Sequence, residues 1–180
     1  MDQYSFVITF VSIILGVAIA KSLEAIGKPL KRGTQSDFYP LHAMAGSLLV
    51  LLIVQYWWGI FDERSIENWT FLNFLQFVLT PILFYFTAEV FSPGNDGQDT
   101  RTYYWRHIRT GLLVMALLFV NNIMTDLLWP EISGDIIAQA IRGTAILVLA
   151  GMAISRSEKL HYAGYIFFYL AFAAFVLTSP

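Results

Sequence analysis

Six apolar segments, each about as long as a bilayer crossing, constrain this chain more than any other feature. They cover residues 4–23, 42–61, 69–91, 108–129, 136–155 and 160–178. A helix needs about 20 residues to cross the hydrocarbon core. Only 13% of the residues are charged, whereas soluble domains carry about a quarter. The sequence therefore predicts an all-α integral membrane protein, with residues 1–180 forming one transmembrane domain of six helices.

The first apolar segment is predicted to be a true transmembrane helix and not a secretory signal. Only Asp2 precedes it among charged residues, and a signal peptide needs a basic region before its apolar stretch. The chain has no cysteine, which excludes disulfides and thiolate metal ligands.

The distribution of basic residues predicts the orientation in the membrane. Short cytoplasmic loops are enriched in Lys and Arg. The second, fourth and sixth predicted helices are each preceded by basic residues, whereas the opposite side carries only Arg64. Both termini are therefore expected on the non-cytoplasmic side of a plasma (inner) membrane. The nine cytoplasmic residues are Lys21, Lys28, Lys31, Arg32, Arg101, Arg106, Arg109, Arg156 and Lys159.

Glycine and proline suggest where the helices break or bend. Residues 27–40 contain Gly-Lys-Pro and Arg-Gly-Thr, and we predict a cytoplasmic loop there. Pro81 lies in the middle of the third predicted helix. It is expected to kink that helix and to free a backbone carbonyl that a neighbouring helix must satisfy.

An offset of 65 residues aligns the first two predicted hairpins without a gap. Glu24 then matches Glu89, His42 matches His107, and Gly46 matches Gly111; Tyr39 and Tyr104 match as well. Glu158 and His161 repeat the theme more loosely before the last helix. The pattern predicts three helical hairpins in which each second helix opens near a histidine.

We call the glutamates and histidines near the ends where the helices of each predicted hairpin are joined the inner set. Carboxylates and imidazoles together suit a divalent metal ion or a proton relay, and His42 with His107 suits axial ligation of haem. Alternatively, these side chains lie among lipid headgroups, with each Glu paired to a Lys or Arg. The inner set is Glu24, Glu89, Glu158, His42, His107 and His161.

A second polar group, the outer set, falls in the other half of the predicted membrane. Arg142 lies about 10 Å inside, counting 1.5 Å per residue, and Asp126 is at a similar depth on the preceding helix. A buried charge needs a partner or water. The pair either fixes the packing of two helices or lines a water-filled vestibule. The outer set is Gln55, Asn73, Gln76, Asn121, Asn122, Asp126, Gln139 and Arg142.

No catalytic motif appears, so the chain is predicted not to be an enzyme, and no cofactor is expected.

The leading hypothesis is a small homo-oligomeric channel or transporter that conducts an ion or small solute. In it the outer set forms a vestibule and the inner set an ion or proton site. A scaffold or regulatory subunit, whose polar residues serve helix packing, is the alternative. A haem- or quinone-binding redox subunit is a third. The expected partners are lipid, further copies of the chain and the conducted solute, but not nucleic acid.

Overall fold

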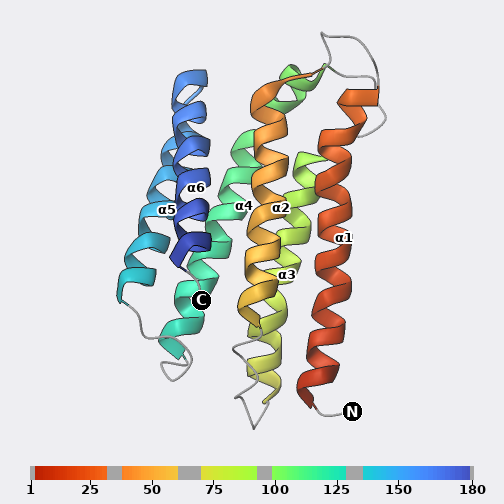
Figure 1. Cartoon of the computed structure of the whole chain (residues 1–180), viewed down its shortest axis with the longest axis vertical. Helices are drawn as coiled ribbons and strands as arrows, with labels where there is room; N and C mark the ends of the chain where they lie inside the picture. Colours follow the sequence, from red (N-terminus) through yellow and green to blue (C-terminus); the bar gives the residue numbers. More distant parts are fainter. Residues whose placement is uncertain (1–2, 32–37, 61–69, 93–98, 129–135, 179–180) are drawn as a thin grey trace.

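The computed structural model of the protein describes residues 3–31, 38–60, 70–92, 99–128 and 136–178. Every regular element in these ranges is a helix (Figure 1). The six helices are α1 (Gln3–Lys31), α2 (Pro40–Gly59), α3 (Phe71–Phe91), α4 (Thr100–Leu128), α5 (Ile136–Ile154) and α6 (Glu158–Thr178).

All six helices are long and apolar enough to cross a membrane, which confirms the predicted class. Even α5, the shortest with 19 residues, extends about 28 Å at 1.5 Å per residue. Large apolar side chains cover the outside of the bundle, such as Phe71, Leu147 and Leu177, which are 78%, 74% and 85% exposed. Monomeric soluble proteins rarely expose so much continuous apolar surface, whereas lipid accommodates it.

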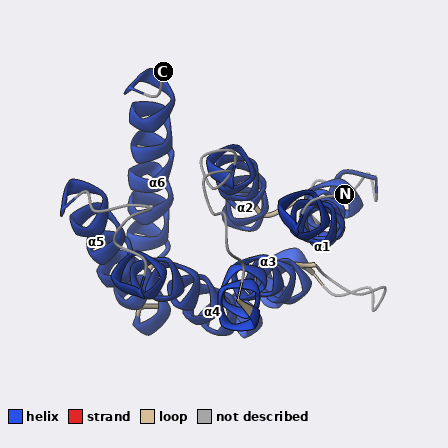
Figure 2. Cartoon of the chain, turned by 90° about the horizontal axis from the view of Figure 1, so that it is seen from below, coloured by secondary structure: helices blue, strands red, loops and turns tan. Residues whose placement is uncertain are grey.

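The helices contact one another in the order α1, α3, α4, α5, α6, α2 and back to α1. Helix α2 also contacts α3 and α4, so it lies between α1 and α6 with the α3–α4 layer beside it (Figure 2). Successive helices run in opposite directions, and α1 begins and α6 ends toward the same end of the bundle (Figure 1). We call the end at which α2, α4 and α6 begin the inner end, and the opposite end the outer end.

Glycines mark the close crossings within the predicted helix pairs. A methyl group added at Gly46 would lie 3.1 Å from Ile26 and 3.3 Å from the Ser22 carbonyl on α1. One added at Gly111 would collide with the Phe91 ring on α3. Because Ile26 and Phe91 are also 65 residues apart, the sequence repeat coincides with a repeated helix crossing. Small residues allow such close approach between helices in lipid.

Two predicted boundaries are wrong at the inner end. Residues 27–31 continue α1 instead of starting the predicted loop, and α4 begins at Thr100 instead of residue 108. Hydropathy predicts only the apolar part of a helix that lies in lipid. Backbone hydrogen bonds continue the helix into the polar residues at its end. Asp99 starts α4, because its carboxylate accepts hydrogen bonds from the Thr102 backbone N–H and hydroxyl, both at 3.1 Å. An acidic cap of this kind is readable from sequence.

Pro81 lies inside α3, as predicted, and the helix continues through it. Proline has no N–H to donate to the carbonyl four residues earlier, which here belongs to Phe77. The Tyr56 hydroxyl of α2 donates to that carbonyl at 3.3 Å. The expected compensation by a neighbouring helix is therefore present.

Part of the predicted loop, residues 32–37, and the stretches 61–69, 93–98 and 129–135 between predicted helices, which include Arg64, lie outside the described residues.

Candidate functional site

The centre of the outer set is a polar ladder between α3 and α4. The Gln76 side-chain amide donates to the Asn121 carbonyl oxygen Oδ1 at 2.8 Å and to the Thr125 hydroxyl at 3.0 Å. The Asn121 side-chain amide donates to the Thr80 hydroxyl at 2.8 Å, and that hydroxyl donates to Asn122 Oδ1 at 3.3 Å. These polar groups satisfy one another across a helix contact. We call these five residues the α3–α4 ladder.

The predicted ion pair between Arg142 and Asp126 is present and joins α5 to α4. The Asp126 side chain is 8% exposed and the Arg142 side chain 26% exposed. Each charge is therefore largely removed from solvent and has its partner on the adjacent helix. This is the geometry that the packing interpretation requires.

The remaining members of the outer set lie elsewhere. Asn73 belongs to the N-terminal cap of α3, where the Thr70 hydroxyl accepts from the Asn73 backbone N–H at 3.2 Å. Gln55 and Gln139 are half-buried on α2 and α5. The structure thus brings together Gln76, Asn121 and Asn122 in the ladder and Asp126 with Arg142 in the ion pair, but not the outer set as one group.

The three inner glutamates each have a basic partner. Glu24 pairs with Lys28 at 3.3 Å, and Glu89 pairs with Lys21 at 3.2 Å across the α1–α3 contact. Glu158 pairs with Arg101 at 2.7 Å across the α4–α6 contact. Among the described residues, no three His, Asp or Glu side chains gather closely enough to hold a metal ion.

A buried chain of hydrogen bonds connects α4 and α6 at the inner end. The Tyr104 hydroxyl lies 2.6 Å from Nδ1 of His161 and 3.1 Å from the Tyr165 hydroxyl. Nε2 of His161 lies 3.1 Å from the Ser155 carbonyl, which can only accept. Nε2 must therefore carry the proton, so Nδ1 of the neutral ring accepts from Tyr104, which in turn accepts from Tyr165. We call Tyr104, His161 and Tyr165 the Tyr–His chain.

Aromatic and charged groups cover the Tyr–His chain at the inner end. The Tyr39 hydroxyl donates to Glu158 at 3.1 Å and accepts from the Trp105 indole N–H at 3.1 Å. The Tyr39 ring packs edge-on against Tyr104, with 5.3 Å between centroids. Burial raises the pKa of Tyr39, against the lowering effect of the Trp105 hydrogen bond, so its phenol is protonated at neutral pH.

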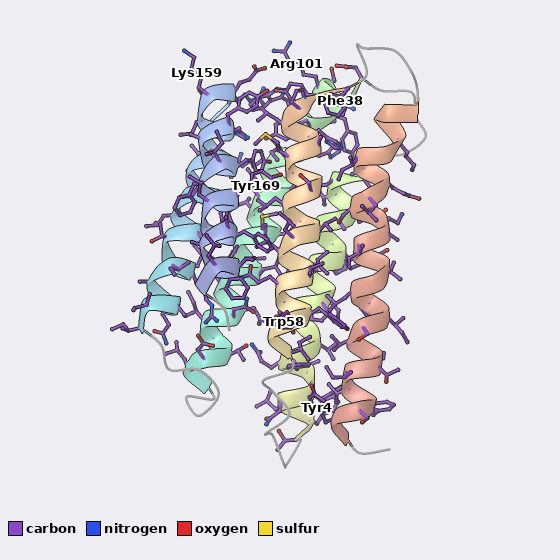
Figure 3. The ribbon with its side chains drawn as sticks, in the orientation of Figure 1. Tyr4, Phe38, Trp58, Arg101, Lys159 and Tyr169 are labelled. Atoms are coloured by element: carbon purple, nitrogen blue, oxygen red, sulfur yellow. The ribbon has the colours of Figure 1, made fainter. Side chains whose placement is uncertain are left out.

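Toward the middle of the bundle, Tyr169 continues the line of polar groups on α6. Its hydroxyl donates to the Met44 carbonyl at 2.9 Å and lies 2.5 Å from the Ser47 hydroxyl on α2. Figure 3 shows Tyr169 between the inner end, where Arg101, Phe38 and Lys159 lie, and Trp58 and Tyr4, which lie toward the outer end.

His42 is buried beside this chain, and neither of its ring nitrogens has a hydrogen-bond partner in the described structure. Its ring packs edge-on against Tyr103 and Tyr104, at 5.8 and 6.4 Å between centroids. The Ala25 backbone lies beside the ring without completing a hydrogen bond. Tyr103 also packs against His107, at 4.5 Å, so one phenol ring contacts both histidines considered for haem.

Sequence reasoning found the histidines and Glu158 but not the phenols that link them. The sequence shows Tyr39 and Tyr104 as matching aromatic residues of the repeat, and Tyr165 and Tyr169 as neighbours on one helix face. Their hydrogen bonds depend on how α6 is rotated toward α4 and α2. The spacing of residues within one helix does not determine that rotation.

No protein-family model matches the chain, and neither the curated proteins nor the solved structures contain a match. The fold itself indicates the class: the six helices of the described residues are long and apolar enough to cross a membrane, which is typical of an integral membrane protein.

Proposed function

We propose that the protein is a small channel or transporter that conducts protons, and that the Tyr–His chain is its working site. The observation that carries the proposal is the run of hydrogen bonds from Tyr165 through Tyr104 to His161, buried among membrane-length helices. Ionisable residues inside a membrane are costly and most often functional. This proposal keeps the inner part of the sequence-based hypothesis and assigns the outer set to helix packing.

The chain has the chemistry that proton transfer needs. Each phenol can accept one proton while donating another, and imidazole can do the same through its two nitrogens. When Tyr104 passes its hydroxyl proton to Nδ1 of His161, it takes the hydroxyl proton of Tyr165, so the hydrogen bonds then run from His161 to Tyr104 and from Tyr104 to Tyr165. Loss of a proton from His161 and uptake of one by Tyr165 complete the transfer and restore the neutral chain.

We assign proton exchange at the exposed end to Glu158, which accepts a hydrogen bond from Tyr39 beside Tyr104. Tyr169 lies one helical turn after Tyr165, and with Ser47 it is the next hydroxyl pair on the path.

The proposal includes both termini on the non-cytoplasmic side of the plasma membrane and assembly into a homo-oligomer. The positive-inside distribution supports the orientation. The contact between Arg142 and Asp126 supports a structural role for the outer half, since each charge already has a protein partner.

Proton flux into proteoliposomes tests the proposal directly. Purified protein is reconstituted around a pH-sensitive dye, and a potassium diffusion potential drives protons inward. The flux should exceed that of protein-free vesicles. Tyr104→Phe and His161→Gln should each lower it by about tenfold or more, since each removes a proton-transferring group.

Tyr85→Phe is the matched control, because Tyr85 is a half-buried tyrosine on α3 outside the Tyr–His chain. It should leave the flux unchanged. Wild-type protein that conducts no better than empty vesicles, or equal losses in all three variants, would overturn the proposal.

A membrane-embedded scaffold or regulatory subunit is the second candidate function. The α3–α4 ladder favours it, because those polar side chains are satisfied by one another. A scaffold would give no flux above empty vesicles and would co-purify from its native membrane in a stable complex with another protein.

A further inference from the structure

One face of α4 carries two arginines above a long exposed apolar stripe. Arg106 and Arg109 are exposed, and so is Thr110 beside them. Below them the same face continues with apolar side chains that are between 41% and 61% exposed. Spacings of three and four residues keep these positions on one side of a helix. The apolar members are Leu113, Leu117, Val120, Met124 and Leu127.

Neither arginine has an acidic partner among the described residues. Three other basic side chains at the inner end have acidic partners: Lys21 pairs with Glu89, Lys28 with Glu24 and Arg101 with Glu158. Glu89, which is on the neighbouring α3, is therefore already engaged. Arg106 and Arg109 leave two positive charges on a face whose lower part is apolar.

The two arginines lie at the depth of lipid headgroups. Gly111 contacts Phe91, the last residue of α3, so this level marks the inner end of the α3 span. Arg109 and Arg106 lie about 3 and 7.5 Å above it along the helix. From Leu113 to Leu127 the apolar stripe runs about 21 Å, which is longer than one leaflet of a core about 30 Å thick and is therefore enough to line an acyl chain.

We propose that this face of α4 binds an anionic phospholipid. Its phosphate would lie against Arg106 and Arg109, and an acyl chain would follow the stripe below. Guanidinium groups bind phosphate oxygens through paired, charge-assisted hydrogen bonds, and the Thr110 hydroxyl is placed to add another. The proposal does not depend on proton conduction.

Lipid binding by detergent-purified protein tests it, with native mass spectrometry counting bound phosphatidylglycerol and phosphatidylcholine of identical chains. Wild type should prefer phosphatidylglycerol by roughly tenfold or more, as two basic contacts allow. The double variant Arg106→Gln/Arg109→Gln should lose that preference. The control Arg156→Gln/Lys159→Gln removes the same charge at the same end of the bundle and should retain it.

A second measurement locates the acyl chain without changing either arginine. The chain has no native cysteine, so Leu117→Cys carries a single fluorophore. Phosphatidylglycerol with brominated chains should quench it more strongly than brominated phosphatidylcholine, and inorganic phosphate should not relieve the quenching. Equal quenching by both lipids, or equal loss of preference in the two double variants, would mean diffuse attraction to a basic surface and would overturn the proposal.

Discussion

At the scale of single residues, the buried charges and amides of the outer half are distinguished by having partners on adjacent helices. Asp126 is 8% exposed and contacts Arg142 directly. Removing one member of such a pair leaves the other charge unpaired in a poorly solvated place. Removing both leaves no charge to solvate.

The first residue-scale prediction compares these two cases in detergent micelles. Arg142→Met should lower the free energy of unfolding by about 3 kcal/mol, near the lower end for broken buried pairs because Arg142 is partly exposed. The double variant Arg142→Met/Asp126→Leu should recover most of that loss. Unfolding is followed by helical circular dichroism during denaturant titration. A double variant less stable than the single one would show that the pair itself holds α4 against α5.

This pair could be predicted from sequence because a short connection between two antiparallel helices fixes the relative depth of their residues. The Tyr–His chain could not be predicted in this way. Tyr104 and His161 are 57 residues apart on helices that are not consecutive. Their contact depends on the packing of the whole inner end.

At the scale of the helix, α3 shows how a local break is repaired by a neighbour. Pro81 leaves the Phe77 carbonyl without its helical donor, and the Tyr56 hydroxyl supplies one from α2. The sequence indicated that a neighbour must satisfy this carbonyl. It did not indicate Tyr56, because the relative height of α2 and α3 is set by packing.

A double-mutant cycle tests this repair. Tyr56→Phe should lower the stability of the wild type by about 0.6–1.7 kcal/mol, the range for hydrogen bonds between membrane helices. In a Pro81→Ala background the restored N–H satisfies Phe77, so the same substitution should cost less. The two losses are measured by unfolding in micelles. Equal losses in both backgrounds would assign the effect of Tyr56 to packing alone.

Helix ends were the least predictable feature of the elements. The apolar pattern gave all six helices, but it started the fourth helix eight residues late, because residues 100–107 are polar and aromatic while remaining helical. Those residues include Tyr104, which belongs to the Tyr–His chain, and Trp105, whose ring packs against His161. The part of α4 to which we assign a function therefore lies largely outside the apolar segment that hydropathy detects.

At the scale of the whole molecule, the distribution of basic residues predicts the orientation in the membrane. Single cysteines test it cleanly because the chain has none of its own. In intact cells, a membrane-impermeant maleimide should label Phe71→Cys at the outer end. It should leave Lys159→Cys, at the inner end, unlabelled until the membrane is permeabilised. Both side chains are exposed in the structure. The reverse labelling pattern would place the inner site outside the cytoplasm.

We propose that the two polar groups have separate roles: the Tyr–His chain conducts protons, and the α3–α4 ladder holds helices together. Measuring proton flux per folded protein and unfolding free energy on the same two variants tests it most directly. Tyr104→Phe should lose about tenfold or more of its flux. Asn121→Leu should retain its flux while losing about 1–2 kcal/mol of stability. If Asn121→Leu abolished conduction with its fold intact, while Tyr104→Phe conducted normally, the assignment of roles would be wrong.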